Sequence, residues 1–247
     1  MTSTRPVLIV AHPGHELRLF NWMERESPLV FILSDGSGGT QSSRLDYSIS
    51  AIRATGATLI EGSGQRSDRE WYARILAGDV PAFMQAADAI TAAAPATQAP
   101  LVVSDAADGY NPLHDLCQAL GSAVVTRIAR DARPPKFLVS PATAAAIGTE
   151  SIAWKLEDAA ALRKRQAMSA YFPLAEEAAQ LLDETPNVLN TERLLVPTFD
   201  WPDGWNPAWE RFGRKRVNEG RFAVTITYRD HVLGIANALL GRNPGCS

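Results

Sequence analysis

Residues 7–16 have the sequence VLIVAHPGHE, in which an apolar run stops at two of the chain's four histidines. A short apolar run without alternation is typical of a strand buried on both faces, as in a parallel sheet. The Pro-Gly pair at 13–14 favours a tight loop, so that His12 and His15 can turn toward one point. Because neutral imidazole is a common zinc ligand, this loop is a candidate metal site. Two histidines on a surface loop are the alternative interpretation.

Similar apolar runs recur along the first half of the chain, at 29–34, 57–61, 101–105 and 137–140. Helical patterns lie at 15–25, 41–55, 68–94 and 113–131. This alternation predicts an α/β fold: a Rossmann-like, doubly wound and mostly parallel sheet with helices on both faces. Ligands bind such sheets beyond the carboxyl ends of the strands, where we expect His12, Asp35 and Asp105.

The second half is less regular. Residues 141–185 are rich in alanine and charge, and 157–171 predict a helix. The tryptophan-rich stretch 196–213 reads as an irregular loop, 221–228 as a late strand and 229–241 as a closing helix. We therefore expect one domain over 1–247, with a Rossmann-like core and metal site in 1–140 and an irregular C-terminal portion in 141–247.

Composition narrows the class of protein. The 247 residues are 46% hydrophobic, and 24 basic against 27 acidic residues give a formal charge of −3 without a basic block. This argues against nucleic acid or an anionic membrane as partner. No apolar run approaches the roughly 20 residues of a membrane span. Cys117 and Cys246 are too few for a disulfide framework. We expect a soluble, cytoplasmic protein, and the oligomeric state stays open.

A third histidine follows the strand expected at 101–105. Asn111 and Pro112 form a good helix start, a cap followed by a first-turn proline. His114 then falls in the first helical turn, at the same sheet edge as His12. Three histidines with an open fourth position are the pattern of catalytic zinc. A helix-terminal histidine facing solvent is the alternative for His114.

These residues resemble the PIG-L/LmbE-like zinc de-N-acetylase superfamily. The family's A-H-P-D-D-E segment is matched by AHPGHE at 11–16, and its Asp-Gly loop by SDGSGG at 34–39. Its arginine is matched by Arg44, and its H-P-x-H segment by NPLH at 111–114. The resemblance covers residues 6 to 131, in the family's order and spacing.

The resemblance implies that His12 and His114 bind one Zn²⁺, or another divalent cation, and that His15 replaces a ligand aspartate. Gly14 stands where the family has its general-base aspartate, and Asn111 stands where it has a histidine thought to help the tetrahedral intermediate. Exchanging aspartate for neutral histidine makes the ligand set more positive and lowers the pKa of bound water. Losing a base typically costs ~10²–10⁴ in rate, so a replacement is expected.

Asp108 is the preferred replacement base, because it lies in the same loop as His114; Asp105 and Asp35 are alternatives. Asp35-Gly36 and Asp108-Gly109 are also ordinary turn pairs. For Asp35 we further predict a supporting role behind the ligands.

His231 could supply the acid or electrophile lost at Asn111, or could be hydrogen-bonded locally at a helix start. Asn111 itself could contact substrate, although capping is the more common role. Glu16 could form a hydrogen bond to a ligand imidazole, or it could simply be stabilised by the helix dipole in the first turn. Arg44 could bind an anionic or hydroxylated substrate. Tyr47 departs from the family, which has a glutamate there.

The leading hypothesis is a zinc-dependent hydrolase that removes an N-acyl group, above all N-acetyl, from an amino sugar or sugar-like conjugate. The tryptophans of 196–213 could stack on such a small molecule or pack in the core. A catalytically altered metal- or sugar-binding relative is the alternative, as is a zinc hydrolase of another amide or an ester. A phosphate-binding Rossmann module is disfavoured, because SDGSGG is not G-x-G-x-x-G.

Overall fold

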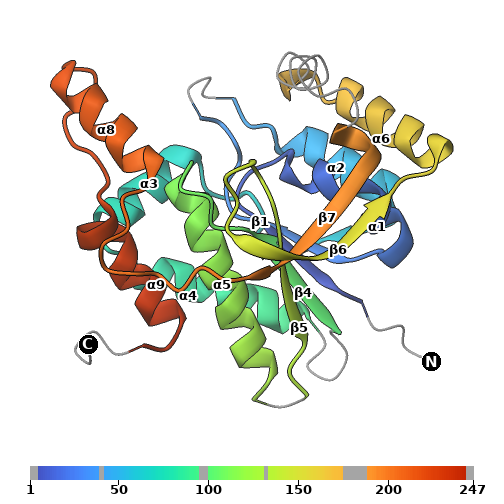
Figure 1. The fold of residues 1–247 in the computed structure, drawn as a ribbon, viewed down its shortest axis with the longest axis horizontal. Helices are drawn as coiled ribbons and strands as arrows, with labels where there is room; N and C mark the ends of the chain where they lie inside the picture. The colour runs from blue at the N-terminus through green and yellow to red at the C-terminus, as the bar shows by residue number, and fades with distance from the viewer. Residues whose placement is uncertain (1–4, 39–41, 95–99, 131–132, 175–187, 243–247) are drawn as a thin grey trace.

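A seven-stranded sheet crosses the molecule in the computed structural model, which describes residues 5–38, 42–94, 100–130, 133–174 and 188–242. The strand order is β3-β2-β1-β4-β5-β7-β6, and the first five strands are parallel. Strands β1, β4, β5, β7 and β6 are labelled in Figure 1. The predicted α/β, doubly wound and mostly parallel sheet is therefore confirmed, since 3-2-1-4-5 is a doubly wound order. The strands are β1 (Val7–Val10), β2 (Leu29–Ile32), β3 (Thr58–Leu59), β4 (Leu101–Asp105), β5 (Lys136–Ser140), β6 (Gly148–Lys155) and β7 (Thr191–Pro197).

The first strand shows why its sequence does not alternate. Val7 and Ile9 join the apolar cluster on one face of the sheet, whereas Leu8 and Val10 join the cluster on the other. All four are at most 1% exposed. A strand buried on both faces needs apolar residues throughout.

Helices cover both faces of this sheet. The first cluster includes residues of α4 (Val80–Ala93), α5 (Pro112–Ile128) and α9 (Leu233–Leu239). The second includes residues of α1 (Phe20–Glu26) and α2 (Leu45–Ala54), and α6 (Asp158–Ala170) packs against it. Figure 1 shows α8 (Ala208–Asn218) projecting from the side that carries α3 (Asp68–Leu76) and α9. Short helical turns complete the described chain: η1 (His15–Leu19), η2 (Phe172–Leu174), η3 (Val188–Asn190) and η4 (Tyr228–Val232).

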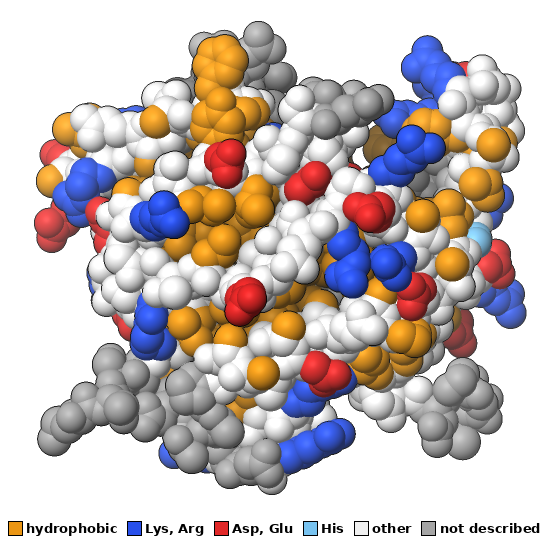
Figure 2. Space-filling model, turned by 180° about the vertical axis from the view of Figure 1, so that it is seen from behind, with side chains coloured by type: hydrophobic (Ala, Val, Ile, Leu, Met, Phe, Trp, Pro, Cys, Tyr) orange, Lys and Arg blue, Asp and Glu red, His pale blue; other side chains and the backbone are white. Residues whose placement is uncertain are grey.

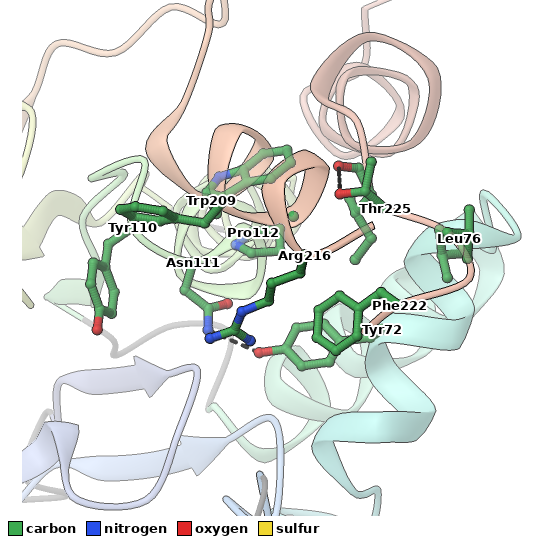
Figure 3. A pocket seen from close by; sticks show the side chains of 13 residues that line it. Tyr72, Leu76, Tyr110, Asn111, Pro112, Trp209, Arg216, Phe222 and Thr225 are labelled. Carbon is green, nitrogen blue, oxygen red and sulfur yellow. Dashed lines mark hydrogen bonds between the residues drawn. The ribbon is translucent and has the colours of Figure 1, made fainter. Parts of the chain in front are cut away.

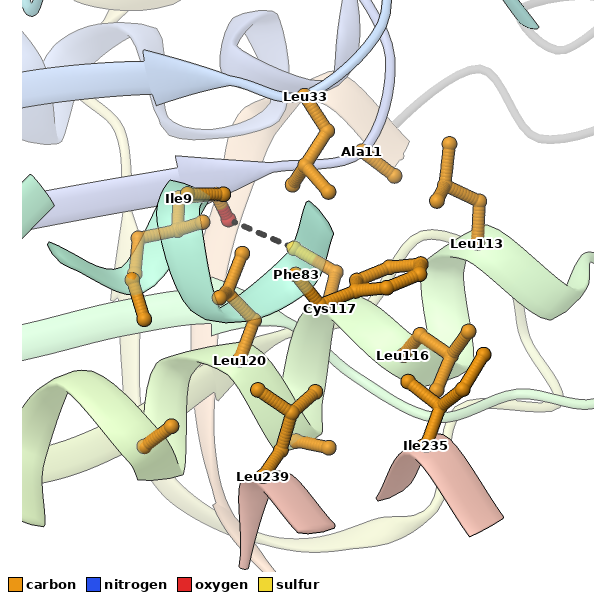
Figure 4. Close-up of a cluster of buried hydrophobic side chains, with 14 of the residues drawn as sticks. Ile9, Ala11, Leu33, Phe83, Leu113, Leu116, Cys117, Leu120, Ile235 and Leu239 are labelled. Carbon is orange, nitrogen blue, oxygen red and sulfur yellow. Dashed lines mark hydrogen bonds between the residues drawn. The ribbon is translucent and has the colours of Figure 1, made fainter. Parts of the chain in front are cut away.

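Helix α5 is the central support of the candidate site. Its Cys117 Sγ donates to the carbonyl oxygen of Ile9 at 3.4 Å, within the cluster drawn in Figure 4. Gly121 faces the sheet so closely that a Cβ would lie 2.8 Å from the side chains of Phe137 and Ser104. The missing side chain lets α5 pack directly on β4 and β5 and fixes its first turn at the carboxyl edge.

Several predicted helix bounds need correction. The helix expected at 15–25 is η1 followed by α1, and that expected at 68–94 is two helices. Gly78, at φ +62°, ends α3, and Asp79 caps α4 by accepting from the backbone N–H of Ala82 at 3.1 Å. A glycine with positive φ followed by an N-cap residue is a strong boundary signal. The helix expected at 113–131 is α5, and that expected at 41–55 is α2; residues 41 and 131 lie outside the described part.

The C-terminal portion differs more from expectation. Strand β6 was not predicted, because its side chains are mostly exposed and it pairs antiparallel with β7 at the sheet edge. The stretch expected as an irregular loop contains the end of β7 and the start of α8. Residues 221–227 form no strand, and the closing helix starts as the turn η4. Gly39, residues 95–99, residues 175–185 and Cys246 lie outside the described residues.

Charge is mixed on the face that Figure 2 displays, where acidic and basic side chains are interspersed. In the described chain, none of the helices combines the length and the apolar character that crossing a membrane would require.

Candidate metal centre

Three imidazoles gather at the carboxyl edge of the sheet, above the ends of β1 and β4. His12 and His15 lie in the loop after β1 and at the start of η1, and His114 lies in the first turn of α5. Their ring centroids are 5.4 Å (His12–His15), 5.1 Å (His12–His114) and 4.6 Å (His15–His114) apart. Three imidazoles that bind one tetrahedral ion through nitrogen at 2.0–2.1 Å would have centroids about 5 Å apart. The spacing of the rings therefore suits a shared ion.

Each of these imidazoles is bonded to a carboxylate through Nδ1. The pairs are His12–Asp68 at 3.0 Å, His15–Asp105 at 2.7 Å and His114–Asp108 at 3.3 Å. A carboxylate at Nδ1 fixes the tautomer in which Nε2 carries the lone pair, and this is the usual support of histidine ligands. The three Nε2 atoms are thus the available donors.

The Nε2 atom of His12 is buried and has no hydrogen-bond partner among the described residues. A buried polar nitrogen without a partner destabilises the folded protein unless something binds it. As placed, however, no three His, Cys, Asp or Glu side chains in the described chain form a set arranged to hold a metal ion. The rings are gathered, and binding of an ion would require their side chains to adjust.

Burial sets the protonation of these groups. It lowers the pKa of His114 and lowers that of His15 well below the ordinary value, despite the nearby carboxylates. Both histidines are thereby held in the neutral form, which is the form that binds metal. Burial would raise the pKa of Asp68, but the hydrogen bond and charge of His12 lower it to about 2. Burial would also raise the pKa of Asp105, but the charge of His15 and its hydrogen bond hold that pKa far below its usual range.

The loop between His12 and His15 is fixed by backbone contacts. Gly14 has φ +102°, and its N–H donates to Glu16 Oε2 at 2.8 Å and to Ser48 Oγ at 3.1 Å. Glu16 is fully buried, and burial raises its pKa. Glu16 bonds the N–H of Gly14 and the side chain of Ser48, while the imidazoles bond the three aspartates and, for His12, Ser34 Oγ at 2.9 Å. Glu16 thus shapes the loop that presents the histidines.

Asp105 joins two parts of the site. Its Oδ2 accepts from the backbone N–H of Ala11 at 2.8 Å as well as from His15. The last residue of β4 therefore fixes the chain at the end of β1. Sequence spacing placed Asp105 at this edge but did not reveal that it would bond His15.

Asp108 is enclosed between His114 and the backbone. Its Oδ2 contacts His114 Nδ1, and its Oδ1 accepts from the N–H of Tyr110 at 2.8 Å. Asn111 caps α5 as expected, because its Oδ1 accepts from the N–H of Leu113 at 2.8 Å. Its amide also donates to the Tyr72 hydroxyl at 2.9 Å. These contacts do not test the predicted roles of Asp108 as a base and of Asn111 toward a substrate.

The loop after β2 holds two further candidates. Asp35 Oδ1 accepts from the N–H of Ser37 at 2.8 Å, which is the turn interaction named as an alternative. Arg44 Nε donates to the carbonyl of Gly36 at 2.8 Å. Both side chains stabilise this loop, and their predicted functional roles stay predictions.

The fourth histidine has a different environment. His231 Nδ1 accepts from the N–H of Thr227 at 3.0 Å and lies 2.9 Å from the Thr227 hydroxyl. This is the local hydrogen bonding named as its alternative, and its catalytic role stays a prediction. Of the tryptophans, Trp201 and Trp209 are buried in the core, and Trp209 Nε1 donates to Asp115 Oδ2 at 2.7 Å.

Two buried groups were missed from the sequence. Asp68 lies 56 residues from its partner His12; the capping box of Ser67 and Glu70 marks a helix start there but not this contact. Asp115 accepts from the N–H groups of Asp108 and Gly109. Burial, together with the charge of Asp108, raises its pKa to about 7. The sequence offered one signal for Asp115, which is that it directly follows His114.

No family model and no curated protein matches this chain. Three solved structures resemble its fold. A triple mutant of a deacetylase involved in the teicoplanin biosynthetic pathway has a TM-score of 0.51 and 14% identity, over 80% of this chain and 100% of that one. A complex of a deacetylase from that pathway with bog has a TM-score of 0.49 and 12% identity, over 80% of this chain and 100% of that one. The zinc-inhibited form of teicoplanin deacetylase Orf2 has a TM-score of 0.45 and 12% identity, over 78% of this chain and 99% of that one. At such identity the first likeness shows a shared α/β fold.

Proposed function

We propose that this protein is a metal-dependent hydrolase that removes an N-acyl group, above all N-acetyl, from an amino sugar or a sugar-like conjugate. One observation carries the proposal: three imidazoles lie about one point, and each has a carboxylate at Nδ1. The resemblance to the PIG-L/LmbE-like superfamily and the likeness of fold to a deacetylase support this reaction class.

His12, His15 and His114 would hold the ion, for which zinc is the preferred candidate. The unpartnered Nε2 of buried His12 and the neutral state of the other two rings fit this role. When bound, zinc supplies a Lewis acid for the amide carbonyl and an activated water. The overall reaction breaks the amide C–N bond, forms a C–O bond to water and passes a proton to the leaving amine.

The chain's own residues would position this chemistry. Asp68, Asp105 and Asp108 orient the imidazoles, and the two contacts of Asp108 favour this positioning role over that of a free base. His231 stays our candidate to protonate the amine. Arg44 and Asn111 stay candidates to contact the sugar.

A second candidate function is a binding protein without turnover. Gly14, which stands where the family has its base, faces the C-terminal portion: a Cβ there would overlap Leu174 Cδ1 and lie 3.6 Å from Tyr171. The space of a family-like aspartate is therefore filled. Leu174→Ala would remove this overlap for Gly14→Asp, whereas the positive φ of Gly14 would strain an aspartate in either background.

The deciding experiment combines metal analysis with acetate release from a panel of N-acetylated amino sugars. We expect one bound ion per chain and turnover that disappears with chelation and returns with Zn²⁺. Full turnover in metal-free protein would overturn the proposal. Bound metal without turnover, together with activity gained by the Gly14→Asp, Leu174→Ala variant, would establish the second candidate instead.

A further inference from the structure

A cavity of about 650 Å³ opens between α3, the start of α5, α8 and residues 222–226, and its lining does not include the three histidines. Its walls are mainly aromatic and aliphatic; Tyr72, Tyr110 and Trp209 lie around it with Phe222 (Figure 3). The volume is within the range of small-molecule sites, which are mostly apolar with a few polar groups. The cavity is thus large enough for a ring-sized substituent of a substrate.

The cavity and the histidines share structural elements. The ring of Tyr110 stacks beside His114, with centroids 6.2 Å apart and planes 28° apart. Asn111 and Pro112 line the cavity and lead directly into His114. Trp209 lines it too and is bonded to Asp115, the residue after His114. A ligand in the cavity therefore lies against the same helix start that presents a candidate metal ligand.

Among the described residues, Arg216 at the cavity has no acidic partner. On α8 and just after it, Arg214 pairs with Glu210, and Lys215 and Arg221 pair with Glu219. Arg216 lines the cavity and lies 5.3 Å from the Phe222 ring, and no carboxylate of the described chain forms an ion pair with it. In Figure 3 its guanidinium points toward the end where Asn111 donates to Tyr72. An unpaired guanidinium beside apolar walls is suited to a carboxylate on an apolar group.

We propose that this cavity binds an apolar, ring-sized group that carries a carboxylate, and that this group belongs to the substrate whose amide is hydrolysed at the histidines. The second clause rests on the proposed function, whereas the first concerns binding alone. Arg216 would be the specificity-determining residue, with Phe222 and Trp209 contacting the ring.

The binding test uses metal-free protein, so that a carboxylate cannot bind an ion. Calorimetry would compare naphthalene-2-carboxylate with neutral naphthalene-2-carboxamide in four proteins: wild type, Arg216→Gln, Arg216→Lys and Lys215→Gln. The last variant removes a neighbouring charge of α8 that does not line the cavity.

We expect wild type and Lys215→Gln to bind the carboxylate about three- to fivefold more tightly than the amide, because Arg216 is exposed and solvent weakens a charge-assisted bond to it. Arg216→Gln should lose the preference, and Arg216→Lys should keep part of it. A preference that survives in Arg216→Gln, or that is absent in wild type, would overturn the proposal.

The second arm uses zinc-loaded protein and the 4-carboxyphenyl and 4-carbamoylphenyl glycosides of N-acetylglucosamine. We expect a higher kcat/KM for the carboxyphenyl glycoside, and loss of this difference in Arg216→Gln. Equal kcat/KM for both glycosides, alongside Arg216-dependent binding, would overturn the assignment of the cavity to the substrate. Absence of acetate release from both glycosides and from the panel of N-acetylated amino sugars would refute the proposed hydrolase, while the binding result would still decide the ligand class.

Discussion

Residues 5–140 and residues 141–242 build their share of the molecule in opposite ways. The first part contributes short parallel strands buried on both faces, and its polar side chains follow the strand ends, where the three histidines gather. The second part contributes an antiparallel edge pair with mostly exposed side chains, and aromatic residues around a cavity. The candidate metal ligands therefore all come from the first part, whereas the cavity is lined by residues of both parts.

A buried ion pair of the second part is hydrogen-bonded to the first part. Lys164 Nζ lies 3.0 Å from Glu192 Oε1 and donates to the carbonyl of Arg18 at 2.7 Å. Glu192 in turn accepts from the N–H groups of Asn21 and Trp22 at 2.9 and 2.8 Å. The C-terminal portion is thus anchored to the chain just after the histidine loop.

The largest expected effect is on the chemistry of the first part. His12→Ala or His114→Ala should abolish both bound metal and turnover, because each removes one of three ligands. His231→Ala, in the second part, should keep the metal content. Metal analysis beside acetate release checks this, and loss of metal in His231→Ala alone would reverse the comparison.

Next in size is the anchoring of the second part. Lys164→Met leaves Glu192 buried without its counter-ion and should lower the free energy of unfolding by about 3–5 kcal/mol. Arg163→Met, which breaks an exposed pair between α6 and Glu24 of α1, should cost much less than Lys164→Met. Denaturant titration measures both, and equal losses would show that burial of the pair does not matter.

A smaller effect on metal affinity is expected from the carboxylates that bond the imidazoles. Asp68→Asn replaces the carboxylate at His12 Nδ1 and should weaken metal affinity by about 10- to 100-fold. Asp88→Asn, on a surface carboxylate paired with Arg127, should leave the affinity unchanged. Competition with a chelator gives both values. If Asp68→Asn bound metal as tightly as wild type, the imidazole–carboxylate pairs would have no role in ligation.

The smallest effect concerns pH. Burial lowers the pKa of His15 and His114, so below about pH 6.5 the unfolded chain binds more protons than the folded one. These two histidines should therefore lower the stability of metal-free protein as pH drops from 7 to 5, whereas Asp115 and Glu16, whose pKa values are raised, act in the opposite direction. The lowered pKa of Asp68 acts only below about pH 3.8, outside this window. Thermal unfolding at several pH values would compare wild type with a His15→Asn, His114→Asn double variant. If stability depends on pH with the same slope in both proteins, burial of the histidines has no such effect.

Much of the fold could be predicted because local pattern and burial agree in the first part. The apolar runs of β1, β2, β4 and β5 have no polar alternation, which only a doubly covered sheet explains. Strand β6 could not be found in this way, because an edge strand with exposed side chains has no such run. The break between α3 and α4 was readable at Gly78 and Asp79 but was hidden by continuous helical periodicity.

By itself, the sequence determined that parallel strands end in polar loops, and it named His12, His15 and His114, since buried runs and turn residues are local properties. The three-dimensional structure was needed to show which carboxylate meets which imidazole and that Leu174 fills the space beside Gly14. It also showed that Arg216 lies at a cavity without an ion-pair partner among the described residues. These contacts join residues far apart in the chain. Their partners are selected by packing of the whole molecule, which no local pattern encodes.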